Sequence, residues 1–270
     1  MFKAPAMLNP RQFVAIPTWL RCAAICSVVM CVVMDSVDAA PFGRRIHHWG
    51  RFRPGSWSVV RQGIETVDDR GEVVDKSTSE LRTELAAASD DDFVLRVQSS
   101  LEFAGRKLES PPQELRQGLL GERGDAAAAV VELPEEDVVI QGRAYRCQVT
   151  QSETNVDGRR QVVKSWISAD VSPYLLRKVT TTYDSASSLV LGESVSEVVS
   201  LASRQRVLAR TRPVAEVRTI QRHPRGQTMS HAVCCPEIPG GVVSQTSQEF
   251  DAQGQLVRRT RMELVDFETK

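Results

Sequence analysis

The residues best suited to chemistry gather in one short stretch, where a histidine is followed closely by two cysteines. His231, Cys234 and Cys235 offer three metal donors within five residues, and Cys147 would be a fourth. A zinc site needs ligands that converge, whereas two-residue alternation along a strand puts Cys234 on the face opposite His231 and Cys235. We therefore expect no metal and no cofactor at this stretch.

A catalytic cysteine with His223 or His231 as its base is the second chemical possibility. No residue pattern orients such a pair, and the chain has no nucleophile elbow, zinc-protease helix motif or phosphate-binding loop. We expect a protein that is not an enzyme.

Four arginines form the third candidate, because they fall at even positions and would share one face of a strand. Arginine suits bidentate contacts with phosphate or carboxylate groups. The sequence predicts a possible face for an anionic ligand, such as a phospholipid headgroup, or an ordinary solvated strand face; its members are Arg204, Arg206, Arg210 and Arg212.

The first 39 residues have the layout of a secretory signal. Three basic residues precede the apolar run 22–34, and Val37 and Ala39 suit the small pockets of a signal peptidase. Thirteen apolar residues are fewer than the roughly 20 that span a bilayer. We predict a signal peptide over 1–39 and an exported protein of the periplasm or cell envelope. The alternative is an uncleaved helix that anchors the chain in the inner membrane.

Cleavage would change both the charge and the cysteine content. Of 34 basic and 34 acidic residues, 31 and 32 would remain, a formal charge of −1 that gives no reason to expect nucleic acid as a partner. Three cysteines would remain in an oxidising compartment, which favours one disulfide. Neighbouring cysteines rarely pair, so we expect Cys147 to bond Cys234 or Cys235; three reduced, buried thiols are the alternative.

An internal repeat indicates how the chain is built. Residues 170–184 align with 237–251 without a gap at an offset of 67, and a looser copy begins at Pro54. Each copy has a proline, a strand that ends in an apolar residue and Asp, a turn and a returning strand. Together with other hairpin signals, such as Asp157-Gly158, the repeat predicts about ten antiparallel strands.

Other segments break this pattern. The stretch Gln113–Leu120 follows two prolines and is the best helix candidate. Residues 40–53 resemble a flexible tail, and 121–137 resemble a loop or linker. We expect a single β domain over 54–270: a strongly curved sheet with a short helix, or else a closed barrel or a sandwich.

One strand end carries a family resemblance. The run Trp166-Ile167-Ser168-Ala169-Asp170-Val171-Ser172-Pro173 resembles a strand end of exported bacterial proteins of the LolA-like class, and 237–243 is similar to it. That class includes the periplasmic lipoprotein carrier LolA and the sensing domain of the stress regulator RseB. The resemblance implies an unclosed β half-barrel whose concave face holds acyl chains.

These observations favour a protein that binds an apolar or amphipathic envelope ligand, a lipid or lipoprotein acyl chain, in a curved sheet. The alternative is a structural or interaction module of the envelope that contacts a protein partner and holds no small ligand. The sequence predicts no transmembrane segment after signal cleavage.

Overall fold

The computed structural model describes residues 43–270 except 91, 104–105, 119–128 and 157. The predicted signal peptide, residues 1–39, lies outside the described residues. The described chain is almost entirely strand: β1 Trp57–Val67, β2 Val73–Ala88, β3 Asp92–Phe103, β4 Arg106–Glu109, β5 Gln113–Gly118, β6 Ala129–Ile140, β7 Arg143–Val156, β8 Arg159–Ile167, β9 Leu175–Asp184, β10 Val190–Val207, β11 Arg210–His223, β12 Gly226–Cys234, β13 Val242–Asp251 and β14 Leu256–Glu268.

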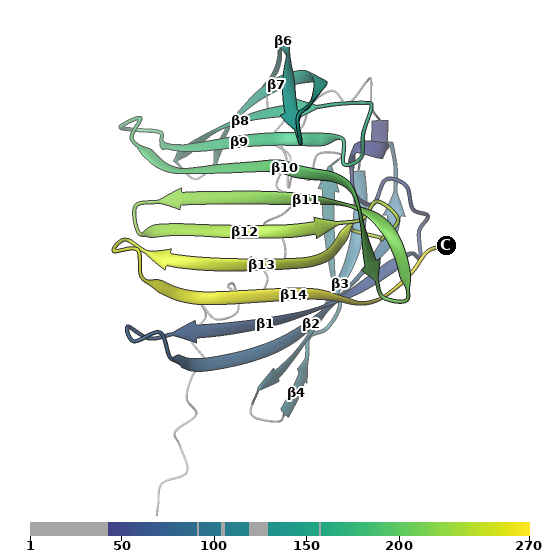
Figure 1. The fold of residues 1–270 in the computed structure, drawn as a ribbon, viewed down its shortest axis with the longest axis vertical. Helices are drawn as coiled ribbons and strands as arrows, with labels where there is room; N and C mark the ends of the chain where they lie inside the picture. The colour runs from purple at the N-terminus through teal and green to yellow at the C-terminus, as the bar shows by residue number, and fades with distance from the viewer. Residues whose placement is uncertain (1–42, 91, 104–105, 119–128, 157) are drawn as a thin grey trace, which may run out of the picture. The chain divides into compact units, whose positions relative to one another are not determined.

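The described strands form one open antiparallel sheet (Figure 1). Its order is β4-β3-β2-β1-β14-β13-β12-β11-β10-β9-β8-β7-β6, and β5 pairs with the outer side of β3. Strand β1 pairs with the last strand, β14, which joins the two ends of the described chain within the sheet. The prediction of a mainly β, curved and unclosed sheet is confirmed. No described helix is long and apolar enough to cross a bilayer.

The repeated units are the hairpins of this sheet. Strands β9 and β13 begin and end at positions that differ by 67, as the alignment requires. The aspartate that ends the first strand caps each turn: Asp68, Asp184 and Asp251 all accept hydrogen bonds from backbone N–H groups two to four residues later. The β9–β10 turn is one residue longer, since Asp184 N–H bonds Leu189 O whereas Asp251 N–H bonds Gln255 O.

Three local predictions are wrong. The proposed helix at Gln113–Leu120 is strand β5 over its described part, because Leu115 pairs with Leu95 and packs on the core of β2 and β3. The described part of the proposed linker, 129–137, belongs to β6. The short helix is instead a 3-10 turn, η1 Gly43–Ile46, within the segment predicted as a tail.

That segment, residues 43–53, is packed rather than flexible. Trp49 and Phe52 are buried with Leu85, Phe93 and Leu95, and His47 stacks on Phe93 with ring centroids 4.2 Å apart. Apolar burial therefore fixes a stretch whose arginines and histidines gave it the composition of a tail.

Two glycines of the β12–β13 turn lie in close contact with this segment. A Cβ on Gly240 would lie 3.1 Å from the Trp49 ring, and one on Gly241 would lie 2.8 Å from His48 Nδ1. Both glycines have positive φ. In this copy of the repeat, Pro239-Gly240-Gly241 thus serves as a contact surface as well as a turn.

Replacement of Gly241 tests this close approach. Gly241→Ala should destabilise the fold by about 2 kcal/mol, since the methyl group adds a clash to the strain of positive φ. Gly71→Ala is the matched control, because Gly71 has a similar φ of 81° and open space around it, so only about 1 kcal/mol of strain applies. Equal losses in urea unfolding would contradict the packing of His48 on Gly241.

The buried His47 predicts a pH dependence of stability. Burial, and then the neighbouring His48, lower the pKa of His47 to about 3, although the Gln117 side chain opposes the shift. Its Nδ1 accepts the Trp49 backbone N–H at 3.3 Å, as in a neutral ring. The unfolded chain binds this proton near pH 6.5, so the free energy of unfolding falls below that pH.

His47→Phe keeps the stacking on Phe93 and removes the proton. Between pH 7 and pH 5 this variant should lose about 2 kcal/mol less stability than the wild type in urea unfolding. His223→Phe, at the exposed end of β11, is the control for replacing a histidine by phenylalanine away from the core. Parallel curves for the wild type and His47→Phe would refute a neutral, buried His47.

Candidate functional site

The two faces of the sheet differ in exposure across β10 to β14. On β13, Ser247 and Glu249 are half-buried, whereas Thr246 and Gln248, on either side of Ser247, are exposed. On β14, Met262 is buried and its neighbours are exposed. Antiparallel pairing carries this division from strand to strand, so the sheet has a protected inner face and an exposed outer face.

An apolar row crosses the inner face. Its members are joined by direct register pairs from β10 to β1: Val198, Val217, Ala232, Gln245, Met262 and Gln62. Three of the four apolar members are buried. The neighbouring Val60 and Leu264, which pair with each other, are buried as well. These side chains form a continuous apolar strip on the inner face.

A second row, two residues further along each strand, consists of hydroxyl groups. Each member pairs with the next across five consecutive strands: Ser196, Thr219, Ser230, Ser247 and Thr260. All five are half-buried, and Thr219 Oγ1 donates to Ser196 Oγ at 2.9 Å. The hydroxyl row spans roughly 19 Å and runs about 7 Å from the apolar row. The inner face therefore presents apolar and hydrogen-bonding strips side by side.

Gln62 ends the apolar row with an unsatisfied amide. Its side chain is only 2% exposed, and its Nε2 has no hydrogen-bond partner among the described residues. A buried amide donor without a partner costs about 1–3 kcal/mol. Gln62 faces Met262 on one side and Ser79 on the other, so a polar ligand atom over this position would satisfy it.

Beyond the hydroxyl row, the inner face carries charged side chains that form an ion pair. Arg258 Nη1 lies 3.1 Å from Glu249 Oε2, and both side chains are more than one-third exposed. Thr66 pairs with Arg258 in the same row. The inner face therefore changes along each strand from apolar to hydroxyl-bearing to charged.

The structure divides the predicted arginine face. The chain reverses at Leu208 and Ala209, where Val207 pairs with Arg210 and Gln205 pairs with Arg212. Even positions on β10 therefore lie opposite odd positions on β11, so Arg204 and Arg206 face away from Arg210 and Arg212. The prediction of one shared face is wrong, because it treated 204–212 as a single strand.

The Arg212 side chain makes its contacts within the protein. It forms an ion pair with Glu237, and its guanidinium lies 5.3 Å from the Phe267 ring centroid. Arg204, Arg206 and Arg210 are exposed.

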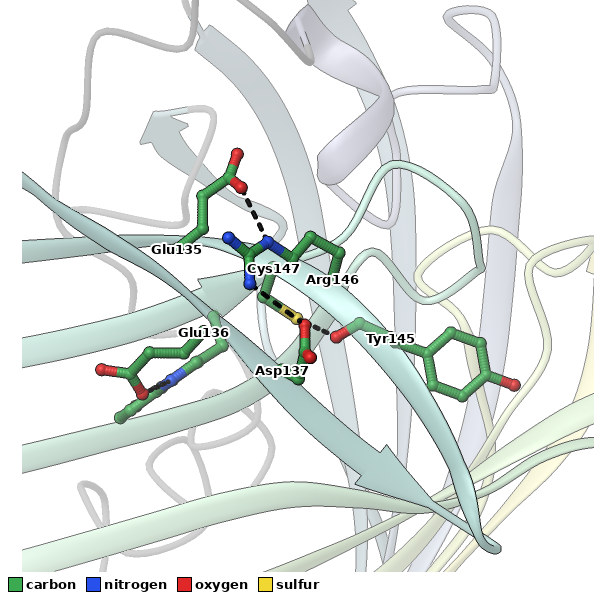
Figure 2. Close-up of polar contacts among 7 residues, drawn as sticks. Glu135, Glu136, Asp137, Tyr145, Arg146 and Cys147 are labelled. Carbon is green, nitrogen blue, oxygen red and sulfur yellow. Dashed lines mark hydrogen bonds and ion pairs between the residues drawn. The ribbon is translucent and has the colours of Figure 1, made fainter.

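None of the three predicted disulfide partners forms a disulfide in this structure, and their surroundings differ. Cys147 is buried with Val149, and its Sγ donates to Tyr145 O at 3.4 Å, beside the ion pairs of Arg146 with Glu135 and Asp137 (Figure 2). Burial raises the pKa of Cys147 to about 11 and also raises that of Cys235. Cys234 and Cys235 lie at the β12–β13 turn. A disulfide from Cys147 is therefore not formed in this structure, and buried thiols of this kind are poor nucleophiles.

The residues proposed for metal or cysteine chemistry are dispersed. His231 lies on the outer face, with Nε2 3.2 Å from Glu216 Oε2. Within the described ranges, no group of three histidine, cysteine or acidic side chains could hold a metal ion.

Cys234 and Cys235 line a small pocket with His47, His48 and Tyr174. Its cavity of about 30 Å³ has room for water and not for a chain-like ligand.

Sequence reasoning missed the main features of the inner face. Gln62 and the hydroxyl row were not selected, although period-two alternation with Ser and Thr was visible on several strands. Their alignment into rows requires the register of six strands, which no single segment specifies.

Comparisons with known proteins give remote similarity. No family model matches the chain, and no curated protein matches it. A crystal structure of a candidate lipoprotein from Parabacteroides distasonis ATCC 8503 is 11% identical, with a TM-score of 0.37, and covers 80% of this chain and 96% of its own. A DUF1329 family protein from Desulfovibrio piger ATCC 29098 is 11% identical, with a TM-score of 0.35, and covers 92% of each chain. The similarity to the LolA-like class stays a prediction.

Proposed function

We propose that the protein is an exported, non-catalytic envelope protein that binds an amphipathic ligand, such as a lipid or a lipoprotein acyl group, on the inner face of its sheet. The observation that carries the proposal is Gln62, a buried amide donor without a protein partner at the end of an apolar row. Native proteins rarely leave such groups unsatisfied away from functional sites.

The two rows of the inner face specify the ligand class. A purely apolar ligand would bury the hydroxyl row without partners, at a cost for each unsatisfied group. A purely polar ligand would bring no apolar group to the apolar row. A molecule with an apolar chain and hydrogen-bonding groups along one side satisfies both rows, which is a narrower class than the acyl chains that the family resemblance implies.

The first test is native mass spectrometry of residues 40–270 purified from the envelope of the source organism. An added mass that organic solvent extracts would support the proposal. A bare mass would count against it, and the same spectrum would report a disulfide as a loss of two hydrogens.

Two neighbouring substitutions on β12 locate the ligand. Ser230→Trp places an indole over the hydroxyl row and should abolish the adduct, because the side chain occupies the inner face. Met229→Trp, one residue away on the outer face, should keep it. Melting temperatures confirm that both variants fold. Retention of the adduct in folded Ser230→Trp would exclude the inner face as the site.

Gln62→Leu separates binding from stability. Removal of the unsatisfied amide should raise the free energy of unfolding of the ligand-free protein by about 1–3 kcal/mol and weaken ligand binding. Gln248→Leu, at an exposed position on β13, should change neither quantity by more than about 0.5 kcal/mol. Lower stability in ligand-free Gln62→Leu would show that the amide is satisfied within the protein.

One observation favours the alternative, an interaction module. Strand β6 ends the sheet, and its only described partner is β7. Val131 and Val139 on β6 are 55% and 67% exposed. An open edge with exposed valines can pair with an extended segment of a partner protein. A bare mass in the first test, together with capture of a peptide by β6, would favour this function.

A further inference from the structure

The β10–β11 hairpin extends beyond the neighbouring strands and bends. Register shifts at Val198, Ser200 and Ser203, with Ala202 at φ 56°, interrupt the ladder. Such bulges bend a strand. The Gln141 side chain bonds Ser200 and Leu201, which holds the bend. Figure 1 shows the hairpin turning across the ends of β12 to β14, where Arg212 reaches Glu237 and Phe267.

The tip of this hairpin carries arginines without acidic partners. Arg204, Arg206 and Arg210 are exposed, and none lies within ion-pair distance of a described carboxylate. By contrast, Arg218 and Arg222 on the same hairpin pair with Glu197 and Glu193. The tip is two strands wide, with Arg204 and Arg206 on one face and Arg210 on the other, and Arg206 Nε donates to Leu208 O at the turn.

An exposed leucine occupies the turn itself. Leu208 is 43% exposed and has a φ of 51°. Two-residue hairpin turns favour Asn or Gly at such positions, because positive φ strains residues with larger side chains. Leu208 therefore combines backbone strain with exposure of an apolar side chain, and neither benefits the isolated fold. Strain of this kind clusters at functional sites.

We propose that the tip of the β10–β11 hairpin docks on an anionic lipid bilayer. Leu208 enters the interfacial region, while Arg204, Arg206 and Arg210 contact phosphate groups of the lipids. The arginines surround a protruding residue instead of converging on a pocket, which suits a flat charged surface better than a single phosphate ion. This inference stands apart from the ligand proposed for the inner face.

Vesicle flotation of residues 40–270 tests the docking. The protein should bind phosphatidylcholine vesicles that contain phosphatidylglycerol, should release them at high salt, and should not bind pure phosphatidylcholine. R204Q/R206Q/R210Q should lower the affinity roughly a hundredfold, since each arginine near an anionic surface contributes about fivefold.

The matched control is R70Q/R159Q/R225Q, which removes three exposed arginines from the opposite ends of the strands. It should retain binding within about threefold. An equal loss in both triple variants would overturn the proposal, because net charge alone would then explain binding. Equal binding to both vesicle types would also overturn it. So would a wild-type protein that binds inorganic phosphate through the hairpin arginines but does not bind vesicles.

Leu208→Asn provides an independent measurement. The substitution should lower vesicle affinity several-fold and leave the melting temperature equal or higher, because Asn tolerates positive φ. Unchanged vesicle affinity with a lower melting temperature would assign Leu208 a structural role and contradict its insertion.

Discussion

A single curved sheet must protect one face without a second layer, and this constraint governs the rest of the structure. Segment 43–53 packs across part of the inner face through Trp49, Phe52 and His47. Elsewhere the inner face combines buried apolar side chains, such as Val198 and Met262, with half-buried hydroxyl groups. An open sheet of this kind cannot carry a fully apolar inner face in water, and a fully polar one would give it no core. The apolar and hydroxyl rows are the resulting compromise.

Features encoded within one hairpin were predictable from the sequence. The repeat located β9 and β13 correctly, and the turn aspartates act as caps because their chemistry involves neighbouring backbone groups only. The strand β5 was missed for the opposite reason: two prolines suggested a helix start, yet pairing of Leu115 with Leu95 decided the conformation. Local propensity is a weak guide where a sheet edge and a core are available.

The errors at the candidate sites share a cause. Even spacing of arginines predicts a shared face only if the strand continues, and the two-residue turn at Leu208 reverses that parity. The tail prediction relied on charge, whereas burial of Trp49 against β2 and β3 determined the structure. Gln62 is distinguished only by its burial and its missing partner. Both depend on its place between the next strand, β2, and the last strand, β14, which is distant in sequence.

The formal charge of the predicted mature chain bears on how an anionic surface could attract it. At −1, the whole-molecule charge supplies no attraction, so any affinity must come from local asymmetry within about a Debye length, roughly 8–10 Å. On the outer face, Arg218 and Arg222 pair with cross-strand glutamates, and Arg261 pairs with Glu263 on its own strand. Arg212, paired with Glu237 and packed on the Phe267 ring, instead fixes the direction of the hairpin. The paired Arg212 therefore orients the tip of the hairpin. Arg204, Arg206 and Arg210, which have no acidic partner among the described residues, give the tip its positive charge.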